Sequence, residues 1–374
     1  MSKKIVFLVG LLLLLTLIPA VAAPAEDETL SLTLEEAMEL ALANNNQVEL
    51  NRLSIEKAKL ELEQAKHGAK KIDFDAIDAM PREMRAGLGL DMYQLHLAKY
   101  VAPVASQAKL TIAEKQVELS ENVLRLEVEK NYYELLRKKT ALDNAQNALL
   151  RAQEQLRIAQ ESYKAGVLAK SDVVGAEVLV ASKEAEVVNA QNQFDKAVMN
   201  LAQTLGLELD TKIVPATQFS FEPVIIDLAK EVEKALEQDI SVIGAKEGLK
   251  VAEVTFEQAR GFYTPNVFMY REAEYGLEEA KVNLKKAQDE VELKVRNAYL
   301  DLLSAQKAYE TLEKSLEAAK ENYRVAKLRF EAGVATRLEM EQAADQLSEQ
   351  EGSLMEMLYN YNLAAALFKY GIFN

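Results

Sequence analysis

The sequence contains no cysteine and no tryptophan, and its 374 residues include only 14 glycines and 7 prolines. Without cysteine the chain has no disulfide framework and no lipid-modified cysteine, so its fold must rest on packing. Glycine and proline interrupt helices, and here they are scarce beside abundant Ala, Leu, Glu, Lys and Gln. This composition, with 49% hydrophobic residues, predicts long helices or coiled coil.

Positive charge is also in deficit. The chain has 44 Lys and Arg against 59 Asp and Glu, which gives a formal net charge of −15. A nucleic-acid partner is disfavoured, because phosphate neutralisation requires clustered Lys and Arg. The charge balance instead predicts a solvated acidic surface.

Residues that carry catalysis or bind metals are nearly missing. The two histidines, His67 and His96, have no cysteine and no distinctive carboxylate pattern beside them, so we interpret them as surface residues rather than ligands. The Ala-Gly-Leu-Gly stretch at 86–89 precedes no helix start of the kind that a phosphate loop needs. We therefore predict no metal, no cofactor and no enzymatic activity.

The amino terminus predicts export. Residues 1–23 combine two lysines, an apolar run over 5–18 and a small-residue ending, Pro-Ala-Val-Ala-Ala. These are the parts of a cleaved signal peptide. The alternative is an uncleaved anchor, since residues 5–22 are just long enough to span a bilayer. Cleavage is favoured because the apolar run is short and the Ala-Val-Ala ending is typical.

The rest of the chain is built from one unit used twice. A helix starting after Thr33, with Glu36 as its capping-box partner, and a second helix from about residue 48 open the first unit. Residues 41–66 align with 235–260, and the later segments also repeat, so the unit is roughly 170 residues long. We predict a first repeat over 24–206, a crossover over 207–226 and a second repeat over 227–374. Thr, Val, Phe and Pro make the crossover an extended segment or short strand.

Each repeat contains a long helical hairpin. Residues 163–167 read Tyr-Lys-Ala-Gly-Val and residues 330–334 read Phe-Glu-Ala-Gly-Val. A lone glycine between two helical segments adopts the left-handed conformation that ends a helix, so we place turns at 165–168 and 332–335. Apolar residues recur every seven positions along the arms, as in coiled-coil seams. These positions are Leu135, Leu142, Leu149, Leu156 and Tyr163; Leu302, Tyr309, Leu316, Tyr323 and Phe330; Val173, Val180, Val187, Phe194 and Leu201; and Met340, Leu347, Leu354, Tyr361 and Phe368. We interpret Tyr132, Tyr133 and Tyr299 as packing residues rather than ligand contacts.

Several of these motifs together resemble the TolC family of outer-membrane efflux proteins. They are the Leu-Thr-Leu-Glu-Glu-Ala stretch at 32–37, the two Ala-Gly-Val turns, and the Leu-Ala-Gln-Thr-Leu-Gly-Leu stretch at 201–207. The resemblance implies a homotrimer whose helices form a hollow α-barrel across the periplasm. It also implies that the glycine turns form the tip that meets a periplasmic adaptor (membrane fusion protein), which couples the tube to an inner-membrane pump.

The resemblance also implies the residues of that docking tip. They are Ala165, Gly166, Val167 and Asp172 in the first repeat, and Ala332, Gly333, Val334 and Thr336 in the second. Glu339 matches a position where the family places an acidic ring around the closed aperture, while a second such position holds Gln342. The alternative interpretation is that each glycine only closes a helix.

One departure from the family concerns its membrane β-strands, each of which needs about 9–11 residues of alternating apolar character. In the second repeat only residues 261–267 and a few more are free of helical pattern. In the first, residues 70–85 are too charged to face lipid, and we interpret them as a solvated loop, with an interfacial membrane contact as the alternative. The predicted fold is therefore mainly all-α: long helical hairpins in two tandem repeats, a TolC-like coiled-coil α-barrel with little or no β-barrel.

These observations favour a passive conduit of the cell envelope, in the periplasm or outer membrane, that serves an efflux or type I secretion system. The second hypothesis is a non-conducting coiled-coil scaffold derived from the same fold. An enzyme is a distant third, because no group of residues supports one. A conduit requires a closed ring of subunits and a scaffold does not.

Overall fold

The computed structural model of the protein describes residues 30–217 and 220–373. The predicted signal peptide over 1–23 lies outside the described residues. Within them the chain is almost entirely helical, with two three-residue strands. The predicted fold class, mainly all-α with long hairpins in two tandem repeats, is confirmed. None of the helices in the described ranges has the length and apolar character needed to cross a membrane.

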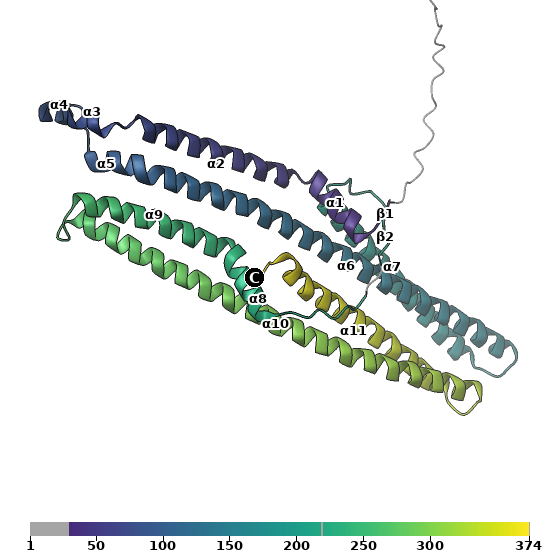
Figure 1. Cartoon of the computed structure of the whole chain (residues 1–374). Coiled ribbons are helices and arrows are strands. Elements are labelled where there is room, and N and C mark those ends of the chain that lie inside the picture. Colours follow the sequence, from purple (N-terminus) through teal and green to yellow (C-terminus); the bar gives the residue numbers. More distant parts are fainter. Residues whose placement is uncertain (1–29, 218–219, 374) are drawn as a thin grey trace, which may run out of the picture.

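Two long hairpins lie side by side and turn at the same end of the molecule (Figure 1). The first consists of α6 (Ala102–Lys164) and α7 (Lys170–Thr204), and the second of α10 (Phe268–Glu331) and α11 (Arg337–Tyr370). At 1.5 Å per residue, α6 and α10 are each about 95 Å long. The two repeats therefore place equivalent turns next to each other in space.

The other half of each repeat packs against the same long helices. In the first repeat, α1 (Leu34–Asn44) and α2 (Asn46–Lys71) lie against α6; in the second, α8 (Leu228–Gln238) and α9 (Ile240–Phe262) lie against α10. The predicted capping box is present, because Thr33 and Glu36 bond each other's backbone N–H groups. Since α6 also contacts α9, the helices α2, α6, α9 and α10 form one continuous layer.

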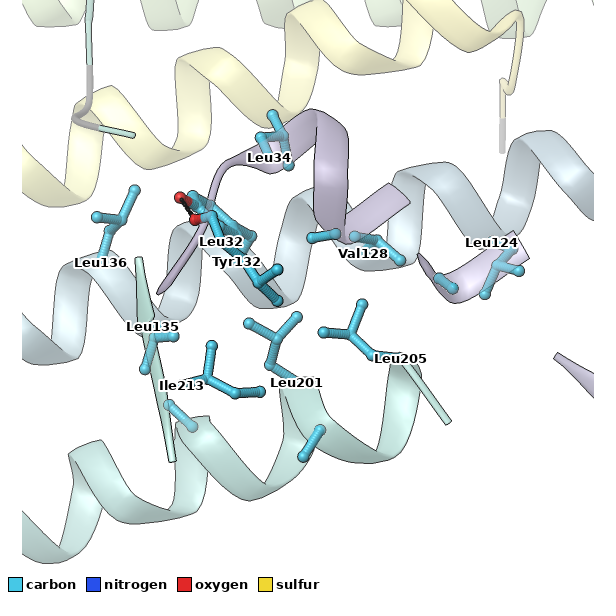
Figure 2. Close-up of a cluster of buried hydrophobic side chains, with 14 of the residues drawn as sticks. Leu32, Leu34, Leu124, Val128, Tyr132, Leu135, Leu136, Leu201, Leu205 and Ile213 are labelled. Carbon is cyan, nitrogen blue, oxygen red and sulfur yellow. Dashed lines mark hydrogen bonds between the residues drawn. The ribbon is translucent and has the colours of Figure 1, made fainter. Parts of the chain in front are cut away.

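The core follows the predicted heptad seams. In the first repeat Leu135 and Leu201 are fully buried together with Tyr132 (Figure 2). In the second, Leu302 and Phe368 occupy the seam positions of Leu135 and Leu201, and the seam residue Tyr361 is fully buried. Burial of each large side chain contributes about 1.5–3 kcal/mol. The seam residues Tyr163 and Phe330 are the exceptions, since both are exposed where the hairpins end.

Two buried tyrosines hold the connection between the repeats. Strands β1 (Leu30–Leu32) and β2 (Ile213–Pro215) pair in parallel, and β2 lies within the segment predicted to contain a short strand. The Tyr132 hydroxyl donates to the Leu32 carbonyl at 2.8 Å (Figure 2) and accepts from the backbone N–H of Thr217 at 2.9 Å. In the second repeat Tyr361 does the same, donating to the Glu222 carbonyl and accepting from the N–H of Val224, both at 2.9 Å. The predicted packing role of Tyr132 is thus confirmed.

Residues 70–85 are largely solvated, as predicted, but the prediction that they form a loop is wrong. The segment 68–103 forms three short helices, α3 (Phe74–Asp78), α4 (Arg82–Gly87) and α5 (Met92–His96), and a π-helical turn η1 (Leu97–Val101) that leads into α6. Two of its charged residues start helices: Asp73 and Asp91 accept hydrogen bonds from backbone N–H groups of α3 and α5. Local capping explains why a charged segment is nonetheless helical.

His96 is not the surface residue that the sequence indicated. Its ring stacks on Phe74 with centroids 4.1 Å apart and meets Phe262 edge-on at 4.7 Å, and its Nδ1 lies 3.2 Å from Oε1 of Gln258. His67, by contrast, is exposed. Phe262 and Gln258 belong to α9, and Gln258 is 162 residues away in the sequence, so sequence spacing does not reveal the cluster. No group of three metal-ligating side chains occurs in the ranges that the structure describes.

Candidate functional site

Each hairpin ends in a fixed backbone turn. In the first, Gly166 has φ of 75°, and the N–H of Val167 bonds back to the carbonyl of Ser162 at 2.9 Å. In the second, Gly333 has φ of 74°, and the N–H of Val334 bonds back to the carbonyl of Arg329 at 2.9 Å. This six-to-one bond after a left-handed residue is the Schellman motif, which satisfies the last carbonyls of a helix.

The two tip glycines are needed for conformation rather than for space. A Cβ atom at Gly166 or Gly333 would meet nothing within 4 Å. An L-residue at such a φ pays about 1–2 kcal/mol relative to the right-handed region. Helix closure is therefore sufficient to explain each glycine, and the two neighbouring valines need a separate explanation.

The valine after each glycine points into solvent. Val167 is 77% exposed and Val334 is 66% exposed, and Leu338 one turn later is 63% exposed. None of these side chains is needed to close the turn, because the Schellman bonds are made by the backbone. Each tip therefore presents an apolar side chain on a rigid, exposed loop, which is the usual position of binding residues.

The predicted acidic and hydroxyl residues of the tip act locally as helix caps. The Ala169 N–H donates to the Asp172 carboxylate at 3.0 Å. Glu339 accepts from the backbone N–H of Thr336 at 2.7 Å, and the Thr336 hydroxyl accepts from the N–H of Glu339 at 3.3 Å. The backbone hydrogen bond, followed by the hydroxyl, lowers the pKa of Glu339, so this carboxylate is ionised at neutral pH.

A polar groove lies between the two hairpins. Farther from the turns, this groove of about 520 Å³ separates α6 and α7 from α11. It is lined mainly by polar side chains, among them Arg137, Asn144, Asp345 and Glu349. Apolar seams hold each hairpin together, whereas polar residues face each other between hairpins. Each hairpin is therefore the tighter packing unit.

The layer of helices has two open lateral edges. On one edge, α2 exposes Leu50, Leu53 and Leu60, and α7 exposes Val174, Val178 and Val188. On the other, α10 exposes Phe268, Tyr275, Val282, Leu293 and Leu300, all close to one line along the helix. We call these the α2/α7 edge and the α10 edge. Apolar lines of this kind are coiled-coil seams, and the structure provides no partner for them within the described residues.

Comparison with known proteins adds the family. Residues 78–207 and 266–367 match the sequence profile of the outer membrane efflux proteins, which covers more than half of the chain. The chain belongs to the outer membrane efflux protein family. This family consists of outer-membrane channels rather than enzymes, and it places the protein in the cell envelope.

Individual relatives are distant. This efflux-family protein is 24% identical over 208 residues to the outer membrane protein TolC of Vibrio cholerae, a match that covers 53% of the chain and 46% of that protein. The chain thus matches about half the length of its curated relative.

Solved structures of similar fold include a membrane protein of Pseudomonas aeruginosa, the CmeC outer membrane channel of Campylobacter jejuni and the MtrE outer membrane channel of Neisseria gonorrhoeae. Their TM-scores are 0.66, 0.66 and 0.60, at identities of 16%, 15% and 18%. Each match covers 90% of this chain and, in the same order, 89%, 85% and 88% of the other. At these identities the likeness concerns the fold.

The structure places the predicted tip residues of this efflux-family protein in two separate groups. Ala165, Gly166 and Val167 lie in one turn, with Asp172 in the first turn of α7. Ala332, Gly333, Val334 and Thr336 form the other, with Glu339 in the first turn of α11. Sequence reasoning missed the two open edges, because periodicity shows that a helix has an apolar face but does not show which face lacks a neighbour.

Proposed function

We propose that this efflux-family protein is a passive conduit of an efflux or type I secretion system, assembled as a homotrimer. Its helices form the wall of a tube, and its hairpin tips dock onto a periplasmic adaptor coupled to an inner-membrane pump. The observation that carries this proposal is the pair of equivalent turns that two tandem repeats place at one end of the molecule (Figure 1). Two like docking points on one rigid end suit a partner with repeated binding elements.

The open edges support assembly into a ring. The α2/α7 edge and the α10 edge are different surfaces on opposite sides of one layer, so they can meet only head to tail. Such heterologous contacts build a closed ring when the rotation between copies closes. Burial of the exposed leucine, valine and aromatic residues supplies the driving force at about 25 cal/mol per Å² of apolar surface.

The exposed valines support docking at the tip. Val167 and Val334 lie on turns whose backbone is already fixed by hydrogen bonds, so binding of a partner there loses little conformational entropy of the loop. The caps at Asp172 and Thr336 stiffen the first turn of the following helix. Under this proposal Glu339 adds an ionised carboxylate to the aperture while it also caps α11.

A non-conducting envelope scaffold is the second candidate function. It is favoured by the helical segment 68–103 and by the match to only about half of the curated relative. A scaffold does not require a closed ring, whereas a conduit does. Oligomeric state therefore separates the two.

Light scattering of the purified mature protein, without and with detergent, tests the ring. We expect the wild-type protein to have the mass of three chains. Leu293→Asp should lower this mass, because it places a charge on the apolar α10 edge. The matched control is Leu209→Asp, because Leu209 is 53% exposed and Leu293 is 59% exposed, and Leu209 lies outside both edges. A wild-type monomer in both conditions would leave the scaffold as the function.

Crosslinking in cells tests the docking tip. The natural chain has no cysteine, so Val167→Cys creates a single thiol for a photoreactive maleimide. We expect capture of a periplasmic adaptor, identified by mass spectrometry, and its loss in Val334→Asp variants that keep the mass of the assembly. The control thiol is Leu209→Cys. Equal capture of the adaptor from both positions would refute docking at the tip.

A further inference from the structure

The end of the molecule opposite the tips carries an unpaired basic surface. Lys66, Lys70 and Lys71 lie in the last two turns of α2 and are exposed. In the part of the chain that the structure describes, none of the three forms an ion pair with a carboxylate. The helices α3 and α4 follow directly and project past the neighbouring helices (Figure 1). Met84 and Leu88 at this projection are 55% and 61% exposed.

The same end carries an unpaired acidic surface on α10. Glu272, Glu274 and Glu279 lie in its first turns and are exposed. In the described ranges none of the three forms a close ion pair with lysine or arginine, although Arg271 interacts with the charge of Glu274. Beside them Phe268 is 87% exposed and Tyr275 is 59% exposed. This surface therefore combines negative charge with apolar side chains. Its charge is opposite to that of the lysines at the end of α2, and its apolar side chains can pack against those of the α3–α4 projection.

These two surfaces lie at the same level along the molecule but on opposite edges. The Lys99 ammonium donates to the carbonyl of Ile72 at 2.8 Å, and the ring of His96 joins Phe74 to Phe262, so the end of α2 and the turn between α9 and α10 are level. Across the layer, however, α6 and α9 lie between α2 and α10. One chain cannot bring its own two surfaces together.

We propose that the end of α2 and the α3–α4 projection form a clasp that binds the first turns of α10 in a second copy of this chain. The clasp deepens the proposed function, because it rests on the head-to-tail ring of α2/α7 and α10 edges. In that ring, the lysines of one copy meet the glutamates of the next, and Met84 and Leu88 cover Phe268. The segment 68–103 thus acts as an intersubunit contact at the end opposite the tips.

A second copy fits the projection better than a lipid surface does. Four acidic residues, Asp73, Asp75, Asp78 and Glu83, offset the basic ones within the projection. Helices of five and six residues are also too short for the long apolar face that interfacial binding needs. Attraction to anionic lipids requires a clear excess of Lys and Arg, which the projection lacks.

Paired charge reversals test the clasp. We expect Lys70→Glu with Lys71→Glu to raise the dissociation constant of the assembly on the order of tenfold at low salt, because several exposed pairs are lost together. Glu272→Lys with Glu279→Lys on α10 has the same effect, and the four changes combined restore assembly. The matched control is Glu313→Lys with Glu317→Lys, exposed residues on the side of α10 away from its edge. Failure of the combined variant to restore assembly would refute the clasp.

Engineered thiols give a second test, since the natural chain has no cysteine. A chain with Met84→Cys and Phe268→Cys, treated with a bismaleimide, should give crosslinked species of two and three copies on a denaturing gel. Each single-cysteine variant should give no species larger than two copies. Crosslinks only within one chain would overturn the clasp.

The outcomes separate the clasp from the ring. The clasp is overturned, and the ring stays in place, if the wild-type protein has the mass of a trimer but the Met84 and Phe268 thiols do not crosslink between copies and the combined charge reversal does not restore assembly. A wild-type monomer at every concentration overturns both. The protein could instead sediment with vesicles of phosphatidylethanolamine and phosphatidylglycerol. If Leu88→Asp abolishes this sedimentation without changing the mass of the assembly, the projection binds the lipid surface and the clasp is overturned.

Discussion

Loss of one buried hydroxyl at Tyr132 should loosen the connection between the repeats. This hydroxyl donates to the carbonyl of Leu32 and accepts from the N–H of Thr217. In Tyr132→Phe the Leu32 carbonyl keeps a hydrogen bond from the N–H of Ala216 at 2.8 Å. The N–H of Thr217 loses its acceptor, and an unsatisfied donor of this kind costs about 1–3 kcal/mol. Since Thr217 is only partly buried, we expect a loss of about 1–2 kcal/mol.

Hydrogen exchange read by mass spectrometry measures this loss where it occurs. A local loss of about 1–2 kcal/mol corresponds to roughly 5–30-fold faster exchange in peptides that contain residues 213–217. Urea unfolding should show a lower midpoint with an unchanged slope, because the surface exposed on unfolding is the same. The control is Tyr299→Phe, which removes the same atom from a half-buried tyrosine whose hydroxyl bonds to none of the described residues. Equal exchange in both variants would refute the assigned role of the Tyr132 hydroxyl.

Three further predictions concern the hairpins and their base. Gly166→Ala should lower the free energy of unfolding, measured by thermal unfolding, by about 1 kcal/mol, because residue 166 has a positive φ. Gly175→Ala inside α7 should raise it by about 0.5–1 kcal/mol. Equal effects of the two substitutions would contradict the role of Gly166 in the turn. Leu302→Ala should lower the free energy of unfolding by about 2–5 kcal/mol, because Leu302 is 2% exposed. Leu300→Ala, at a site 58% exposed, should change it by less than about 0.5 kcal/mol and weaken assembly instead. Burial, and to a smaller extent the hydrogen bond to Glu129, raises the pKa of Tyr370. Above about pH 10 the unfolded chain therefore loses a proton that the folded chain keeps, so the free energy of unfolding should fall as the pH rises further. Tyr370→Phe should flatten that loss in urea titrations between about pH 9 and 11.

The sequence was sufficient for features that depend on neighbouring residues. The Thr33 and Glu36 cap, the left-handed glycines at 166 and 333, and the seam position Leu302 all follow from contacts within one or two helical turns or from a seven-residue period. Local backbone geometry fixes these features, so the order of residues already encodes them. The tip residues belong to this class.

Features that join distant residues were decided by tertiary structure alone. The His96 cluster unites residues more than 150 positions apart, and the two hydroxyl bonds of Tyr132 reach 100 residues back and 85 residues forward. The helices at 70–85 were missed because their charges looked like those of a solvated loop, whereas Asp73 caps a helix. Which apolar faces remain open on α2, α7 and α10 also depends on the placement of whole helices. Periodicity determines that a helix has an apolar face, and only the packed structure determines what covers it.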